Sequence, residues 1–278
     1  MEVLLKPKVE PLIPVEAEVL TPDRFVGMKL SEIEDLPVYV GNRIEKLSDY
    51  FELEGNIAEK PADQQITILG DASRIKYIGY GMTDGRIIVE GDAGMHLGGK
   101  MSGGEIIVKG NASDWTGAEM RGGLIKVRGS AGNLLGSAYR GSREGMTGGC
   151  IIIKGNAGVE SGIFMRRGVI VVEGDIGAFS GAHMNGGAIF TFGKASRGLG
   201  AEMQGNGSFI VCFKGADSLL PTFIYNTTYK PNFMRIYLKF LSDVLQIDKA
   251  REYFESSFKR YVGDAAVGGN GEIFIVEN

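Results

Sequence analysis

Histidine, cysteine and tryptophan are scarce in this 278-residue sequence, which contains two histidines, two cysteines and one tryptophan. The cysteines, Cys150 and Cys212, lie far apart and form no CxxC pair, so the spacing of iron–sulfur and zinc sites is missing. The histidines, His96 and His183, fall in repeats that are distant from each other, so we expect them not to share a metal. We predict no metal site in this chain, and we interpret the cysteines as reduced thiols of a cytoplasmic protein.

Long apolar runs and an excess of positive charge are missing as well. No stretch approaches the roughly 18 apolar residues of a membrane helix. Pro7, Pro11 and Pro14 interrupt the segment in which a signal peptide needs a continuous apolar core. The net charge of −4 gives no general basic field to attract nucleic acid. The sequence therefore predicts a cytoplasmic protein with no membrane span and no nucleic-acid partner.

Glycine is abundant instead, with 43 residues, and much of it belongs to an internal repeat. Most copies share the pattern G-x-x-M-x-x-G-x-[IL]-x-[IV]-x-G, and the regular copies are 19 residues long. The copy at 125–150 is longer than these by seven residues. Seven copies follow one another, at 66–86, 87–105, 106–124, 125–150, 151–169, 170–188 and 189–208. A short, nearly fixed period of this kind is typical of a stacked repeat protein.

Each part of the repeat has a physical role. The I-x-V segment is a short strand whose alternate side chains point inward. The glycine after it, followed by Asp or Asn as at Gly91-Asp92, predicts a turn in which the polar side chain bonds its own main chain. Nineteen residues are too few for a helix-and-strand unit, yet they suit two or three short strands with turns. We therefore predict an all-β fold, a right-handed parallel β-helix (solenoid) of about seven 19-residue rungs.

One methionine recurs in every rung, and stacking would align these residues in a column. Thioether side chains fill irregular interior space well, so we interpret the column as core packing rather than metal binding. The methionines are Met82, Met101, Met120, Met146, Met165, Met184 and Met203.

The flanks of the repeats predict three regions. Residues 1–65 form an N-terminal capping segment, 66–215 form the β-helix repeats, and 216–278 form a C-terminal helical and capping segment. Around Pro231 to Tyr261, apolar residues fall at helical spacing from Phe233 to Ile247 and are followed by Tyr253, Phe254 and Phe258, which predicts one or two amphipathic helices. These would cover the C-terminal end of the rod or fold along its side, because open end strands aggregate unless they are covered.

Residues for catalysis are hard to find in this sequence. Gly94 to Lys100 imitates a phosphate-binding loop, but Met101 follows it and no helix pattern does, so the match is a product of the repeat. Carboxylates are scattered one per rung, with no facing pair for acid–base work. We therefore assign no catalytic, cofactor-binding or metal-binding residue to this chain.

The long repeat at 125–150 is the exception to the regular pattern. Its extra residues form a loop around 136–145, and long loops on repeat folds often lie on the binding face. A solvated loop that merely tolerates length is the plain alternative. Aromatic and arginine side chains anchor interfaces and bind acidic ligands. The candidate interface or ligand face consists of Trp115, Tyr139, Arg140, Arg143, Arg166 and Arg167.

The repeats resemble those of the C subunit of formylmethanofuran dehydrogenase, and so do both flanks. The matching flank segments are Pro22 to Gly27, Glu32-Ile33, Gly41-Asn42, Leu47 to Asp49 and Phe51, then Tyr261 to Asp264 and Gly268 to Gly271. The stretch Leu219 to Ala250 matches least. The resemblance implies a scaffold subunit of an archaeal complex that reduces CO2 with low-potential electrons of the ferredoxin type and fixes it as N-formylmethanofuran, the first step of methanogenesis from CO2.

The same resemblance assigns the cofactors to other subunits of that complex. These are a tungsten or molybdenum pterin, iron–sulfur clusters and a binuclear metal site, so the implied partners are the catalytic and electron-transfer subunits, with methanofuran as a further candidate ligand. The family is also similar to the C-terminal β-helix domain of glutamate synthase. Three alternatives follow: a β-helix subunit of an archaeal glutamate synthase, a subunit of a formyltransferase/hydrolase complex, and an independent polysaccharide-cleaving β-helix enzyme. The missing carboxylate cluster disfavours the last.

Overall fold

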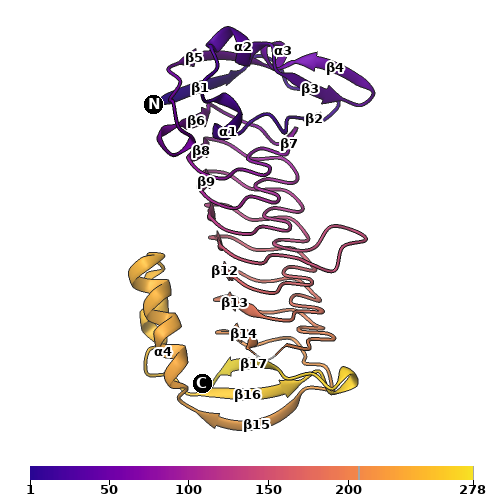
Figure 1. Ribbon diagram of the computed structural model, residues 1–278. Helices are drawn as coiled ribbons and strands as arrows, with labels where there is room; N and C mark the ends of the chain where they lie inside the picture. The colour runs from indigo at the N-terminus through magenta and orange to yellow at the C-terminus, as the bar shows by residue number, and fades with distance from the viewer. Residues whose placement is uncertain (206, 278) are drawn as a thin grey trace.

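The structure, a computed structural model, describes residues 1–205 and 207–277, and strands dominate it (Figure 1). The strands are β1 (Glu2–Pro7), β2 (Val15–Glu16), β3 (Pro37–Val40), β4 (Arg43–Lys46), β5 (Phe51–Gly55), β6 (Gln65–Ile68), β7 (Ile75–Lys76), β8 (Arg86–Val89), β9 (Glu105–Val108), β10 (Leu124–Val127), β11 (Cys150–Ile153), β12 (Val169–Val172), β13 (Gly187–Thr191), β14 (Ser208–Cys212), β15 (Ile224–Tyr229), β16 (Phe258–Gly263) and β17 (Gly271–Val276). The helical segments are short: α1 (Pro22–Phe25), α2 (Leu30–Glu34), α3 (Leu47–Tyr50), α4 (Asn232–Lys239), a π-helical turn (Phe240–Val244) and 3-10 turns at Pro61–Asp63, Asp248–Tyr253 and Ala265–Val267. The fold is therefore mostly β, as the sequence predicts.

Two sheets contain these strands. The large sheet has 13 strands in the order β15-β16-β17-β14-β13-β12-β11-β10-β9-β8-β6-β1-β5, and the small sheet has four, in the order β4-β3-β2-β7. From β6 to β14 the neighbours in the large sheet are parallel and follow one another along the chain, apart from β7. Each repeat thus contributes one strand to the same sheet.

The repeats lie in register with one another. One isoleucine per repeat occupies the same place in the ladder, namely Ile66, Ile87, Ile106, Ile125, Ile151, Ile170, Ile189 and Ile210. A second line of contact consists of single parallel bridges that join Ala72, Ala93, Ala112, Ala131, Ala157, Ile176, Ala195 and Ala216 in turn. Successive repeats therefore stack directly on one another along the long axis of the molecule, as Figure 1 shows.

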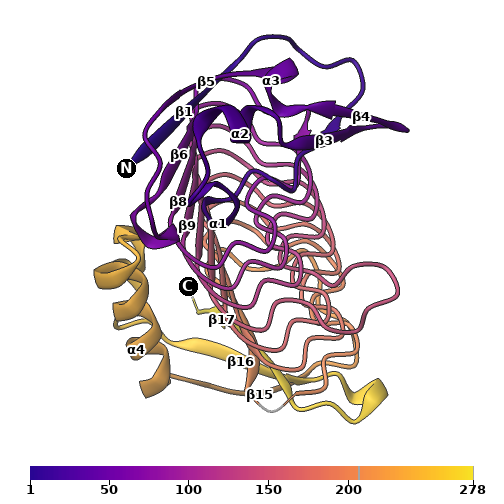
Figure 2. The ribbon, with the colours of Figure 1, turned by 45° about the horizontal axis from the view of Figure 1, so that its top comes forward.

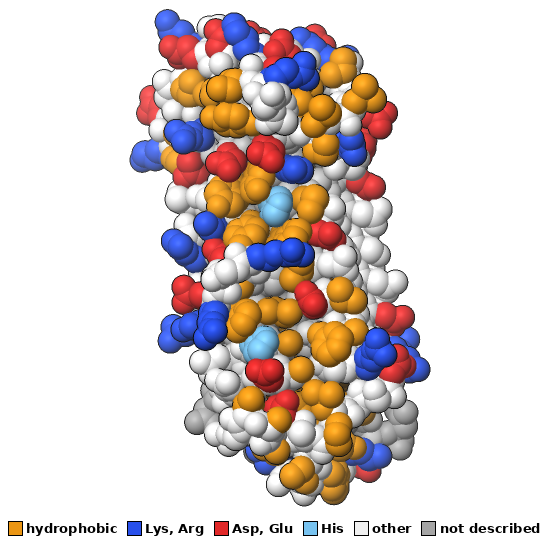
Figure 3. All heavy atoms as spheres, turned by 90° about the vertical axis from the view of Figure 1, so that its right-hand side faces the viewer, with side chains coloured by type: hydrophobic (Ala, Val, Ile, Leu, Met, Phe, Trp, Pro, Cys, Tyr) orange, Lys and Arg blue, Asp and Glu red, His pale blue; other side chains and the backbone are white. Residues whose placement is uncertain are grey.

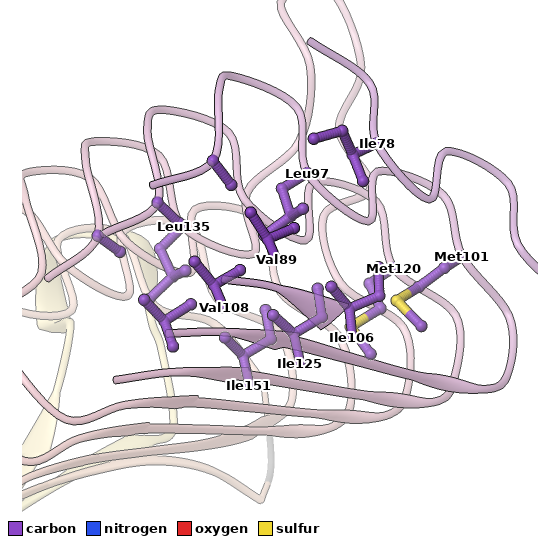
Figure 4. Close-up of a cluster of buried hydrophobic side chains, with 14 of the residues drawn as sticks. Ile78, Val89, Leu97, Met101, Ile106, Val108, Met120, Ile125, Leu135 and Ile151 are labelled. Atoms are coloured by element: carbon purple, nitrogen blue, oxygen red, sulfur yellow. The ribbon is translucent and has the colours of Figure 1, made fainter. Parts of the chain in front are cut away.

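The core lies inside this stack. Ile106, Ile125, Met101 and Met120 are fully buried, and Figure 4 shows their side chains in rows from adjacent repeats. All seven methionines of the repeat pattern have no exposed surface, which confirms the prediction that they pack in the core. A close-packed row of this kind depends on equal spacing, because every side chain must meet its copies above and below.

At the first bend Asp71 Oδ1 accepts a hydrogen bond from Ser73 N at 3.2 Å within its own turn, as predicted, but polar residues at later bends act differently. Asp92 Oδ1 accepts a hydrogen bond from Asn111 N at 2.7 Å, and Asn111 Oδ1 accepts one from Ser130 N at 2.9 Å. The bonds therefore run from one repeat to the next instead of within one turn. The bend leaves these amides at the edge of the stack, and the side chain of the preceding repeat is the nearest acceptor. The prediction that each side chain bonds its own main chain is wrong at these positions.

Glycine is required where the chain turns inward. Gly117 has φ +66°, and a Cβ atom there would lie 2.4 Å from Ile151 Cδ1 in the core. The left-handed backbone disfavours a side chain, and the crowding leaves no room for one. This explains why a glycine recurs at the same point of the repeat.

The N-terminal residues extend the large sheet and cover its first end. Strand β1 pairs parallel with β6 and antiparallel with β5. The helices α1 to α3 and the small sheet lie over the same end of the stack (Figures 1 and 2).

The C-terminal region contains less helix than predicted. Helix α4 and the π-helical turn lie along the outer face of the large sheet, where Met234, Leu238 and Leu241 pack against Val171 and Phe209 among others (Figure 2). Phe258, assigned to the helical pattern, begins strand β16 instead.

Three strands make up the rest of this region. Strand β17 pairs parallel with β14 as an eighth repeat would, and β16 and β15 follow it as antiparallel neighbours. The helical assignment is therefore wrong at Phe258, because apolar residues near the last repeat pair with the open edge of the sheet.

Candidate functional site

Two rows of side chains project from one face of the stack because their backbones are left-handed. Such a backbone is unfavourable for residues other than glycine, by about 1–2 kcal/mol each. The first row is Tyr77, His96, Trp115, Leu134, Glu160 and Phe179, and the second is Lys100, Glu119, Phe164, His183 and Glu202, all with φ between 53° and 64°. Their amides bond the following repeat, as His96 N does to Asp114 O at 3.0 Å, except that Glu202 N bonds Asp264 Oδ2 at 2.9 Å. The ladder between repeats therefore fixes both rows in place.

Aromatic rings stack in the N-terminal half of this face. The rings of Tyr77 and His96 are 4.5 Å apart and nearly parallel, and those of His96 and Trp115 are 5.3 Å apart at 18°. Tyr139 from the inserted loop lies beside the stack, 5.5 Å from His96. Its backbone N–H donates to Glu119 Oε1 at 3.2 Å. We call Tyr77, His96, Trp115 and Tyr139 the aromatic cluster.

The polar atoms of the aromatic cluster are poorly satisfied. His96 Nδ1, Trp115 Nε1 and the Tyr139 hydroxyl are buried, and none has a hydrogen-bond partner among the described residues. Burial lowers the pKa of His96, with the charge of Lys76 adding to the effect. Burial also raises the pKa of Tyr139 far above its usual range. Both groups are therefore neutral near pH 7.

A second group of side chains lies in the C-terminal half of the same face. Phe164 and His183 stack at 4.5 Å, and His183 Nδ1 lies 3.3 Å from Glu202 Oε2. A cavity of about 490 Å³ opens beside them, lined by Arg143, Phe164, Arg166, His183, Asn185, Glu202 and Gln204. In Figure 3 the two histidine rings mark the two groups on the midline of the face, each among apolar side chains.

The structure separates the six predicted interface residues into three sets. Trp115 and Tyr139 both meet the His96 ring. Arg143 and Arg166 line the same cavity, and Arg166 Nη2 donates to the Arg143 carbonyl at 3.5 Å. Arg140 and Arg167 are exposed, and no hydrogen bond or ion pair joins either to the other four within the described residues.

Several members of the face are absent from the predicted set. Tyr77 and His96 precede Trp115 by two repeats and one repeat, and Phe164 precedes His183 by one. The signal was the 19-residue spacing between aromatic residues, which places them in one row once the repeats stack in register. The signal is a spacing between residues, so inspection of each histidine by itself does not reveal it.

The two cysteines are poorly suited to thiol chemistry and metal binding. Burial raises the pKa of the Cys150 and Cys212 thiols to about 12, so neither is a ready nucleophile or ligand. Over residues 1–205 and 207–277 no three His, Cys, Asp or Glu side chains gather in a way that could hold a metal ion. No helix in this part of the chain is long and apolar enough to cross a membrane.

Comparison with known proteins finds similar chains that are subunits of larger complexes. No family model matches it. The C subunit of the molybdenum-containing formylmethanofuran dehydrogenase 1 of Methanothermobacter thermautotrophicus is 50% identical over 99 residues, which are 35% of this chain and 24% of that protein. The C subunit of the tungsten-containing formylmethanofuran dehydrogenase 2 of Methanothermobacter wolfeii is 43% identical over 97 residues, or 35% and 36% of the two chains. The match therefore spans only a quarter to about a third of these curated relatives.

A solved structure covers nearly the whole chain. It is the crystal structure of the formyltransferase/hydrolase complex from Methylorubrum extorquens with methylofuran, one chain of which is 30% identical with a TM-score of 0.89. The likeness covers 99% of this chain and 100% of that one. Sequence and shape thus agree over both flanks as well as the repeats.

Proposed function

We propose that this chain belongs to the family of the formylmethanofuran dehydrogenase C subunit and that it is the scaffold subunit of such a complex. The complex would reduce CO2 with electrons of the ferredoxin type and fix it as N-formylmethanofuran in the cytoplasm of an archaeon. The observation that carries the proposal is the 50% identity to a curated C subunit of that enzyme. The likeness in shape over 99% of the chain supports the role as a subunit of a complex, but does not distinguish the dehydrogenase from the second candidate below.

The catalytic groups of the complex would belong to its other subunits. Iron–sulfur clusters and a binuclear metal site need clustered thiolates, histidines or carboxylates. The donor set here does not fit them, because both thiols are buried, have a pKa of about 12 and lie in different strands. We assign this chain no step of the reaction.

The role we propose instead is mechanical. The repeats would form a right-handed parallel β-helix at 66–215, capped by 1–65 and 216–278, and the rod would position the catalytic and electron-transfer subunits. The stacking of equal repeats in register supports this arrangement. A rod of repeats offers a long rigid surface, which suits a subunit that holds others in place.

Partner subunits would bind on the face that carries the two rows of left-handed residues. Trp115, Tyr139, Arg140, Arg143, Arg166 and Arg167 are the residues that we propose for contact, and methanofuran is a further candidate ligand. Large aromatic and arginine side chains on a rigid surface are typical of interface anchors. The outer face of the sheet is less suited near β11 to β14, because α4 already covers it there.

A formyltransferase/hydrolase complex is the second candidate. The solved complex from Methylorubrum extorquens favours it, since its matched chain resembles this one over its full length. Such a complex would transfer and hydrolyse a formyl group without redox metals. A glutamate synthase subunit stays an alternative that no observation favours.

Metal analysis of the native complex separates these functions. The chain would be tagged in its native host and purified with what it binds, and tungsten, molybdenum and iron would be measured per mole of this chain. We expect a stoichiometric pterin metal together with iron and formylmethanofuran-dependent electron transfer. A metal-free complex with transferase activity would support the second candidate. Recovery of the chain alone, or with a flavoprotein, would reject the scaffold function in this form.

A further inference from the structure

We propose that the aromatic cluster of Tyr77, His96, Trp115 and Tyr139 is a binding site for an extended segment of a partner polypeptide, which offers it backbone carbonyl groups. The inference rests on the proposed function, because it names the site at which another subunit is held.

The first argument is the set of unsatisfied polar atoms. His96 Nδ1, Trp115 Nε1 and the Tyr139 hydroxyl are the buried side-chain polar atoms that lack a partner within residues 1–205 and 207–277, and all three lie in this cluster. A buried group without a partner destabilises the chain that carries it. Native structures contain few buried polar groups without a partner, so three of them around one ring are not a chance arrangement. They indicate bonds that are completed by another molecule.

The second argument is the backbone conformation of three residues of the aromatic cluster. Tyr77, His96 and Trp115 have φ of 63°, 64° and 57°. Glycine would adopt this conformation without strain, and the repeat uses glycine freely at its other corners. Folding alone therefore does not require large rings at these positions. Recognition of a partner gives a reason for them.

Two of the three unsatisfied atoms, Trp115 Nε1 and the Tyr139 hydroxyl, favour an occupant that supplies acceptors. An indole N–H can only donate, and the Tyr139 hydroxyl is free to donate. The nearby cations already have carboxylate partners, with Lys100 3.7 Å from Glu119 and Lys76 3.3 Å from Glu16. A carboxylate ligand would thus bring an uncompensated charge into half-buried aromatic surroundings. Backbone carbonyls are neutral acceptors, and an extended chain presents them at regular intervals.

The inserted loop controls access to the Tyr139 hydroxyl. A Cβ on Gly99 would lie 2.6 Å from that oxygen and 3.0 Å from the Tyr80 ring, so the hydroxyl sits against the Gly99 backbone beside Tyr80. Tyr139 begins the loop, in which Arg140, Gly141 and Arg143 are exposed. A small outward shift of the loop would uncover the hydroxyl for the partner while the stack of rings stays in place.

The test relies on one substitution that should raise the stability of the isolated chain and weaken its binding to the partner subunits. Tyr139→Phe removes the unsatisfied hydroxyl but keeps the ring, so we expect the Tm of the isolated chain to rise by about 2–4 °C. The same variant loses one intermolecular hydrogen bond, so its affinity for the co-expressed partner subunits should fall about five- to tenfold. Tyr229→Phe on the exposed strand β15 is the matched control and should change neither quantity. Differential scanning calorimetry and biolayer interferometry measure the two effects.

Failure of this inference differs from failure of the proposed function. If the wild-type chain binds the partner subunits and Tyr139→Phe binds them equally well, the site is wrong and the scaffold function stands. A lower Tm for Tyr139→Phe would also overturn the inference, because the hydroxyl would then be satisfied within the isolated chain. If the wild-type chain binds none of these subunits, the proposed function itself is rejected.

Discussion

The inward glycine at the corner of each repeat leads to a sharp prediction about single residues. Gly117→Ala places a methyl group 2.4 Å from Ile151 Cδ1 on a backbone with φ +66°. We expect a loss of about 2–4 kcal/mol in the free energy of unfolding, from strain and overpacking together. Gly81→Ala is the control, because Gly81 has φ +68° but no atom near the added methyl, so only about 1 kcal/mol should be lost. Urea denaturation followed by circular dichroism measures both, and equal losses would mean that crowding in the core has no effect.

The half-buried imidazole of His96 predicts a pH dependence of stability. Burial holds its pKa in the folded chain below the ordinary value of about 6.5, so the unfolded chain binds a proton first as the pH falls. The contribution of His96 is therefore fully present above about pH 6.5 and declines as the pH drops toward the folded pKa. His96→Phe keeps a flat ring in the stack and removes the proton. Its urea midpoint should change less than that of the wild type between about pH 7 and pH 5.5, and parallel pH curves would refute this cause.

The roles of individual side chains were predictable only where the repeat itself determines them. The methionines were predicted as core residues because one recurs at the same place in every copy, and all seven are buried. Asp92 was assigned a bond within its own turn, whereas it bonds Asn111 of the next repeat. That partner depends on how far each bend lies from the repeat above, and a linear sequence does not contain this distance. The stack of His96 on Tyr77 escaped prediction for the same reason.

Helix α4 and its π-helical continuation form an element whose contribution can be measured separately. Leu241 is fully buried against the outer face of the large sheet, whereas Ile236 of α4 is 71% exposed. Leu241→Ala should lower the free energy of unfolding by about 2–4 kcal/mol, and Ile236→Ala by less than about 0.5 kcal/mol. Hydrogen exchange read by mass spectrometry should show faster exchange in 232–247 for the first variant only. Similar exchange in both would indicate that this element is held by other contacts.

Elements were predicted well inside the repeats and poorly outside them. The parallel strands follow from a pattern that occurs seven times, so an irregular residue in one copy does not hide the strand that the other copies predict. The C-terminal region occurs once, and the apolar residues from Phe233 to Phe258 fit both helical and strand spacing. Strand β14 decides between them, because its open edge accepts β17 and then β16, which removes Phe258 from the helical part. The local spacing of apolar residues does not determine such long-range strand pairing.

The whole molecule depends on covered ends, and a truncation tests this. Removing residues 216–278 leaves β14 without β17, and it uncovers Phe209 and Val211, which α4 and its neighbours shield in the intact chain. An unpaired strand with an apolar outer face pairs with other chains, so the shortened protein should form oligomers or precipitate, as light scattering after size-exclusion chromatography would show. Phe209→Lys with Val211→Lys in the shortened chain should restore the monomer, because both side chains lie on the outer face while Ile210 and Cys212 belong to the inner core. A shortened chain that stays monomeric without the lysines would show that the C-terminal strands and helix have a purpose other than closing the stack.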